Sequence, residues 1–202
     1  MVWTTRLWFI FTLAVLLLLL PRPRVAHSRP VPMAIQSGPE IGQESPAFDP
    51  QHVWGPDRGT HACPMCKYGY IQGVLYWVSS DDHWDEVKKW ARFLDEESQK
   101  RGTGRFKAYL IYTNPNLKPL KDVEKQLTLL AQELSLRQIA VTYVPSPTDS
   151  ATAVLNKINP GARNTVIVYK KRRVFDKLIN CEPNESNLKR LLASVDSAEK
   201  LK

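Results

Sequence analysis

The chain lacks the sequence features that mark several common classes of enzyme. Its 202 residues include only nine glycines and four histidines. The glycines do not gather into a phosphate-binding loop, and no serine, histidine and aspartate can be combined into a hydrolytic triad. No internal repeat is present. These absences argue against phosphate-loop, hydrolytic and repeat-protein classes and direct attention to the few cysteines.

Positive charge is in excess but is not concentrated. The net charge is +8, and three of these charges lie in the first 28 residues, which contain no acid. Recognition of nucleic acid requires a clustered basic stripe that neutralises phosphates. Only the stretch YKKRRV, residues 169–174, approaches such a cluster. We interpret this stretch as a solvated turn and expect no nucleic-acid partner.

The N-terminal segment has the layout of an export signal. Arg6 precedes an apolar run over residues 7–20, and Ala26 and Ser28 are small residues spaced for cleavage after position 28. A basic start, a short apolar core and a small-residue exit are typical of a secretory signal peptide. We therefore predict a signal peptide over residues 1–28 and an exported protein, periplasmic or extracellular. No cysteine follows the run, so no lipid anchor is indicated.

An uncleaved membrane anchor is the alternative for the same segment. Arg22 and Arg24 follow the apolar run, and this charge balance does not favour an ordinary signal orientation. Contact with the membrane is expected only through such an uncleaved segment. Residues 29–46 are rich in Pro, Gly, Ser and Gln, which is typical of a linker or an extended arm. The remaining residues, 47–198, are expected to form one domain.

That domain alternates strand and helix patterns. Apolar runs predict strands within residues 70–80, 105–116 and 139–145, and two more within 164–181 around a basic turn. Helical spacing of apolar residues predicts helices over 81–102, 117–138, 149–159 and 184–201. The stretch FDPQHVWG, residues 48–55, is not an apolar strand. The resulting order βαβαβαββα predicts an α/β fold of three layers, with a mixed sheet and a terminal hairpin.

This order and several motifs resemble the thioredoxin-like superfamily. The segment IGQESPAFDP, residues 41–50, is similar to the lead-in of redoxins, and GARNTVIVYKKRRV, residues 161–174, is similar to their last hairpin. The stretch GPDRGTHACPMCKYG, residues 55–69, resembles exported bacterial redoxin-like proteins, related to peroxiredoxins and thiol–disulfide reductases, that carry a C-x-x-C-K-Y-G element. The resemblance implies a thioredoxin-like fold and protein thiols, disulfides or a redox protein as partners. It implies no cofactor.

The family usually keeps its reactive cysteine elsewhere. In redoxins that cysteine follows the buried central strand, but here the strand ending at Val78 is followed by serines and aspartates. The proline that family members carry opposite the cysteines is replaced by Asn164. The C-x-x-C pair, Cys63 and Cys66, instead precedes the central strand.

The leading hypothesis is thiol–disulfide exchange by Cys63 and Cys66, with Cys63 attacking and Cys66 resolving. Pro64 is a suitable first helical residue, so a helical turn beginning at Cys63 would direct amide groups at its sulfur and lower its pKa. The first alternative is a non-catalytic domain in which the Cys63–Cys66 disulfide is structural. Since the last strand should run parallel to the central one, Cys181 is expected at the opposite end of the sheet, buried and unbridged.

Two further hypotheses concern the same segment. His61, Cys63 and Cys66 are three soft ligands within six residues, which suggests a metal site. Pro56, Thr60 and Cys63 match the P-x-x-x-T-x-x-C pattern of peroxiredoxins, with Arg163 as the candidate for the supporting arginine. A peroxidase and a Cys/His metal site are therefore the third candidates.

Overall fold

A six-stranded mixed sheet organises the domain. The computed structural model describes residues 34–200, so the predicted signal peptide lies outside the described residues. The strand order is β1-β4-β3-β2-β5-β6, with bounds β1 Gln51–Trp54, β2 Gln72–Val78, β3 Phe106–Tyr112, β4 Ala140–Tyr143, β5 Asn164–Lys170 and β6 Arg173–Ile179. Strands β2, β3 and β4 are parallel to one another. The pairs β1–β4, β2–β5 and β5–β6 are antiparallel. The mixed sheet and terminal hairpin are as predicted.

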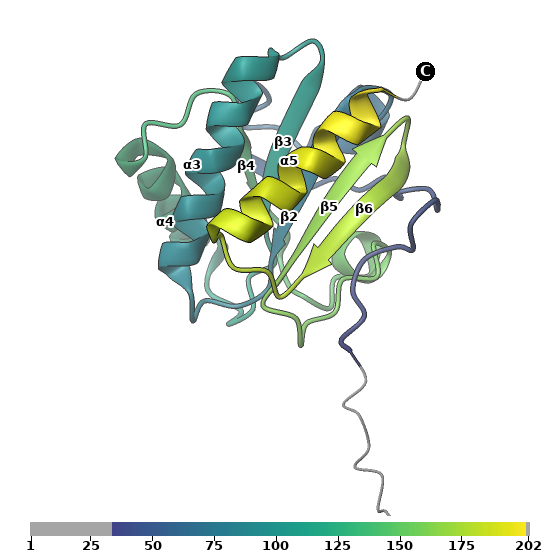
Figure 1. The fold of residues 1–202 in the computed structure, drawn as a ribbon. Helices are drawn as coiled ribbons and strands as arrows, with labels where there is room; N and C mark the ends of the chain where they lie inside the picture. Colours follow the sequence, from purple (N-terminus) through teal and green to yellow (C-terminus); the bar gives the residue numbers. More distant parts are fainter. Residues whose placement is uncertain (1–33, 201–202) are drawn as a thin grey trace, which may run out of the picture. The chain divides into compact units, whose positions relative to one another are not determined.

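One face of the sheet is covered by three long helices, α3 Trp84–Arg101, α4 Leu120–Glu133 and α5 Glu185–Glu199 (Figure 1). Right-handed crossovers between successive parallel strands place α3 and α4 on the same side. Their apolar stripes meet the inward-facing residues of β2, with Trp90 and Tyr76 in tilted contact at 5.7 Å between ring centroids. This layer holds the larger of the two cores.

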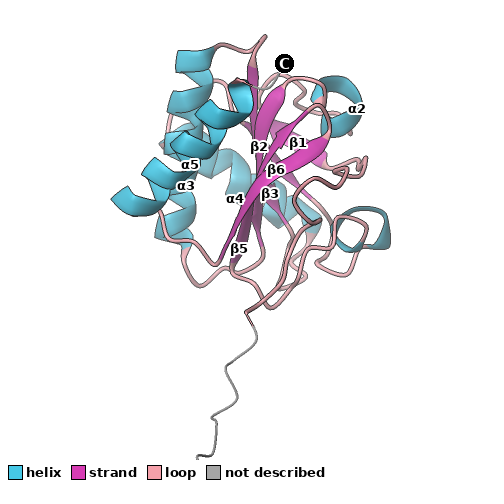
Figure 2. Ribbon diagram, turned by 45° about the vertical axis from the view of Figure 1, so that its right-hand side comes forward, coloured by secondary structure: helices cyan, strands magenta, loops and turns pink. Residues whose placement is uncertain are grey.

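The opposite face has a thinner cover. It consists of the short helix α2 Pro64–Tyr68, the helical turn η1 Ser150–Val154 and the segment around Phe48 (Figure 2). Trp77 of β2 is fully buried there, 5.0 Å from the ring of Phe48. The three-layer arrangement is confirmed, but the predicted helix over residues 149–159 is only the single turn η1.

Strand β1 was not predicted from the sequence, and the predicted element order is wrong at this point. It is a four-residue edge strand, antiparallel to β4, with an irregular register between His52 and Trp54. Its middle residues His52 and Val53 are buried, but the first of them is polar. An edge strand this short and polar has no apolar run to reveal it.

Residues 34–46 of the predicted arm make specific contacts with the sheet. The hydroxyls of Ser37 and Thr165 are hydrogen-bonded at 2.6 Å, and the N–H of Val174 donates to the carbonyl of Gln43. This part of the segment therefore packs along the terminal hairpin. The domain boundary at residue 47 stays a prediction.

Candidate functional site

Helix α2 places the two cysteines at the amino end of the central strand. The helix begins after Cys63, with Pro64 in its first turn. Three residues connect its last residue, Tyr68, to Gln72 at the start of β2. Pro64 and Met65 are buried against the thinner core, whereas Cys63 is half-buried and Cys66 is exposed. The burial of Pro64 and Met65 fixes the orientation of the helix, and in this orientation the Cys63–Cys66 pair is accessible.

The two sulfurs form a disulfide that closes the first turn of α2. Cys63 and Cys66 are bonded to each other, with 5.2 Å between their α-carbons. The N–H of Cys66 donates to Sγ of Cys63 at 3.0 Å, and the N–H of Lys67 donates to the carbonyl of Cys63 at 3.0 Å. Cys63 is thus the N-cap of the helix, as its spacing from Pro64 predicted. An amide aimed at a sulfur stabilises that sulfur as a thiolate.

Hydrogen bonds from β1 hold the segment that leads into Cys63. Nε2 of His52 lies 2.9 Å from the carbonyl of Ala62, and since a carbonyl only accepts, the ring nitrogen donates. Burial lowers the pKa of His52, which keeps the imidazole neutral. The backbone of His52 also pairs with Gly59 and Thr60. The loop before the cysteines is therefore tied to the sheet on both its main-chain and side-chain sides.

Charged side chains surround the exposed face of α2. The ammonium of Lys67 pairs with Asp57, and this hydrogen bond raises the pKa of Lys67 to about 12. The ammonium of Lys107, from β3, lies 4.4 Å from the centre of the Tyr68 ring. Burial is the main cause that lowers the pKa of Lys107. The cysteine pair therefore lies beside two cations, only one of which has a carboxylate partner within residues 34–200.

The residues proposed for a peroxidase are not brought together. The hydroxyl of Thr60 donates to the carbonyl of Asp57 at 2.7 Å. Arg163 precedes β5 next to Val78, at the carboxyl end of β2, where it pairs with Glu86. The seven-residue strand β2 separates the two ends by about 20 Å at the usual rise per residue. Arg163 is therefore not a partner of Cys63.

The metal site suggested by the sequence is also not formed when the two cysteines are bonded as a disulfide. His61 is exposed, and the sulfurs of Cys63 and Cys66 are bonded to each other. Within residues 34–200, no three His, Cys, Asp or Glu side chains gather as a metal site.

Cys181 lies where the topology placed it. It follows β6 at the carboxyl end of β2 and is buried and unbridged. Burial raises the pKa of its thiol. The side chain of Asn164 accepts from the N–H of Cys181 and donates to its carbonyl, at 2.9 and 3.1 Å. Asn164, which stands where the family carries proline, therefore joins β5 to the end of β6.

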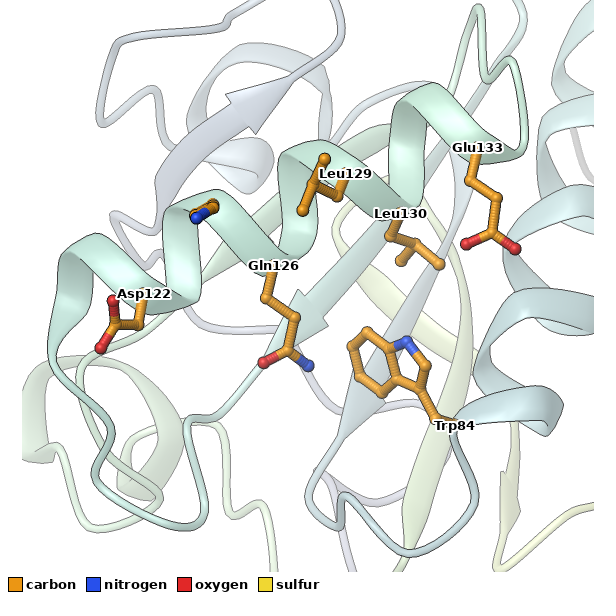
Figure 3. A pocket seen from close by; sticks show the side chains of 7 residues that line it. Trp84, Asp122, Gln126, Leu129, Leu130 and Glu133 are labelled. Atoms are coloured by element: carbon orange, nitrogen blue, oxygen red, sulfur yellow. The ribbon is translucent and has the colours of Figure 1, made fainter.

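Two surface hollows lie away from the disulfide. One, of about 340 Å³, is at the carboxyl end of β2 and is lined by Ser79, Asp81, Asn116 and Arg163 among others. The other, of about 350 Å³, lies between α4 and the start of α3, where the indole of Trp84 faces Leu130 (Figure 3). Neither includes a cysteine, so neither contributes to the candidate redox site.

Comparison with known proteins establishes the fold class. No family model and no curated protein matches the chain. Solved structures do match. One is a Bacteroides thetaiotaomicron protein assigned as a protein disulfide isomerase, with 14% identity, 83% of this chain and 96% of that one covered, and a TM-score of 0.59. Another is a Chlorobium tepidum protein assigned as the thiol:disulfide interchange protein DsbE, with 12% identity, 79% of this chain and 98% of that one covered, and a TM-score of 0.56. A yeast mitochondrial 1-Cys peroxiredoxin also matches, with 17% identity, 80% of this chain and 78% of that one covered, and a TM-score of 0.54.

The chain therefore has a thioredoxin-like fold that carries a Cys63–Cys66 disulfide. These likenesses concern the fold, because the identities are low. Among the described helices, none has the length and apolar character that a membrane span requires.

Proposed function

We propose that the protein is an exported thiol–disulfide exchange protein whose redox pair is Cys63 and Cys66. The observation that carries the proposal is the hydrogen bond from the Cys66 amide to Sγ of Cys63 at an accessible helix start. This amide stabilises negative charge on Cys63 in preference to Cys66, so that Cys63 is the better thiolate. Similar folds assigned as a disulfide isomerase and a disulfide interchange protein support the same activity.

The exchange proceeds through a mixed disulfide. In the reducing direction, the Cys63 thiolate attacks one sulfur of a partner disulfide, a Cys63–partner bond forms, and the other partner sulfur leaves as a thiolate. Cys66 then loses its proton to solvent and attacks Sγ of Cys63, which expels the second partner thiolate. The partner gains two electrons and the protein is left as the Cys63–Cys66 disulfide. The oxidising direction is the reverse sequence.

Substitution of each cysteine tests these roles. We expect Cys63→Ser to lose exchange with a disulfide substrate such as insulin, because the attacking sulfur is gone. Cys66→Ser should instead accumulate a mixed disulfide on Cys63, because the resolving step is removed. Mass spectrometry under non-reducing conditions detects this adduct.

Cys181→Ala is the matched control, since this buried thiol lies at the opposite end of the sheet. It should retain the exchange rate of the unmodified protein. Full activity in Cys63→Ser would contradict the proposal, as would an adduct that forms on Cys66 in place of Cys63.

Export completes the proposal, because a disulfide persists in an oxidising compartment. The support is the sequence pattern of residues 1–28 together with the disulfide itself.

A structural disulfide is the second candidate, and the position of the pair favours it. The bond lies before the central strand, and it closes the turn whose buried residues Pro64 and Met65 attach α2 to the sheet. A disulfide with that role resists reduction and exchanges slowly. The reduction potential separates the two candidates.

A further inference from the structure

The basic turn of the terminal hairpin lies against the helix that carries the cysteines. Strands β5 and β6 are joined by Lys171 and Arg172, both with positive φ, as in a tight two-residue hairpin turn. The N–H of Arg172 donates to the carbonyl of Gly69 at 2.7 Å. A β-carbon at Gly69 would lie 2.7 Å from Cγ of Arg172, so the turn packs closely on the end of α2.

Four consecutive cations therefore project from the end of the sheet that holds the disulfide. They are Lys170, Lys171, Arg172 and Arg173. Arg172 pairs with Glu44, but no carboxylate of residues 34–200 forms an ion pair with the other three. Lys171 and Arg173 are exposed. Most of the positive charge of this turn is thus free to act on a molecule in solution.

Lys107 extends the same surface beside α2. Lys107 lies on β3, opposite Gly73 of β2, and its ammonium reaches the ring of Tyr68. The ammonium of Lys67 lies 5.1 Å from the centre of the same ring. Burial disfavours the charged form of Lys107, the charge of Lys67 acts in the same direction, and only Asp57 opposes them. An anion that docks beside Lys107 would supply the compensation that its own surroundings largely lack.

The carboxyl end of β2 holds acidic and basic groups together. Asp81, Asp82 and Asp85 follow the strand there, and Lys118 and Arg163 pair there with Asp81 and Glu86. The disulfide therefore lies at the more basic end of the central strand. A charge distribution of this kind orients and accelerates the encounter with an oppositely charged partner.

We propose that the basic surface of Lys67, Lys107 and the turn at residues 170–173 docks an acidic protein partner for the Cys63–Cys66 pair. The partner class is a protein thiol or disulfide flanked by carboxylates. The inference rests on the proposed function, since it names the substrates that the redox pair selects. Long-range attraction acts mainly on the rate of encounter, and salt screens it.

Two cysteine peptides of equal length provide the first test, one with glutamates and one with lysines beside the thiol. Each reduces the Cys63–Cys66 disulfide of the Cys181→Ala protein, and the rate is expressed per thiolate because flanking charges shift the thiol pKa. We expect the acidic peptide to react about tenfold faster at low salt. The preference should shrink towards one at high salt.

Two charge reversals locate the effect. Lys171→Glu should reduce the preference for the acidic peptide several-fold. Lys121→Glu makes the same charge change on α4, across the sheet from α2, and should leave the preference as it is. Equal rates for the two peptides, or equal effects of the two reversals, would overturn the inference.

This test is independent of the proposed function, because any accessible disulfide reacts with small thiols. A lost preference with intact insulin reduction would refute the acidic partner alone. A strong preference for the acidic peptide in a protein that does not reduce insulin would refute the exchange activity alone. Binding to vesicles of anionic lipid without any preference between the peptides would assign the basic surface to membranes and would also overturn the inference.

Discussion

His52 is the residue that links the sheet to the turn that carries Cys63. Its side chain is almost fully buried, and its ring donates to the carbonyl next to Cys63. Within the described residues its Nδ1 has no hydrogen-bond partner, so a proton added there would be a buried charge that no acceptor at Nδ1 stabilises. The neutral form of one imidazole therefore supports the position of Cys63.

This arrangement predicts a specific pH dependence of stability. The pKa of His52 is lowered in the folded protein, mainly by burial, so the unfolded chain binds a proton first as the pH falls below about 6.5. Stability then falls with decreasing pH, by up to about 1.4 kcal/mol per pH unit, until the folded-state pKa is passed. Above that window His52 is neutral in both states and contributes no slope.

His52→Gln removes this contribution and keeps a donor for the Ala62 carbonyl. Urea unfolding at pH 7.5 and pH 5.5 should show a smaller loss of stability in this variant than in the unmodified protein. His61 and His83 are present in both proteins, so they cancel in the comparison. An identical loss in the two proteins would show that His52 is not the buried titrating group.

At the scale of elements, the amino end of β2 is closely packed against both neighbouring strands. Gly73 lies between β3 and β5. A β-carbon there would lie 2.3 Å from the carbonyl oxygen of Lys107 and 2.4 Å from the hydroxyl of Tyr169. Because the first of these neighbours is backbone, a side chain at residue 73 would push the strands apart.

Gly73→Ala should therefore destabilise the protein by about 1–3 kcal/mol, the usual range for overpacking. Gly104→Ala is the matched control, because a β-carbon at Gly104 meets no atom within 4 Å. The control should be neutral or stabilising by up to about 1 kcal/mol. Denaturant titration of both variants measures this, and equal stability of the two would contradict the packing described here.

Elements with a strong local signal could be predicted from the sequence. The buried run of β2 and the helical spacing of Val87, Trp90 and Leu94 in α3 identify those elements without tertiary information. The short polar strand β1 could not be predicted, because its stability comes from pairing with β4 and not from its own pattern.

The candidate site was predictable only in part. The C-x-x-C spacing and Pro64 indicated a helical turn capped by Cys63, and the structure has that turn. The contact between Gly69 and Arg172 joins residues about a hundred positions apart. It depends on the hairpin register, so a turn that looks merely solvated in sequence proves to border the site.

For the whole molecule, the central feature is the displacement of the cysteine pair. The redoxin position after Val78 holds Ser79 and Asp81, and Cys181 and Asn164 at that end are engaged with each other. The disulfide lies at the other end of β2, in basic surroundings. The proposed exchange would therefore take place at the end of the sheet opposite to the one that the resemblance to redoxins implies.

The reduction potential of the Cys63–Cys66 pair tests the proposed exchange most directly. It is measured by equilibration with thiol–disulfide buffers in the Cys181→Ala background, so that only one pair titrates. The proposed exchange activity predicts a potential within the range of redox-active pairs, between about −270 and −120 mV. A potential below about −300 mV, typical of structural disulfides, would contradict the exchange activity and assign the bond to the structure of α2.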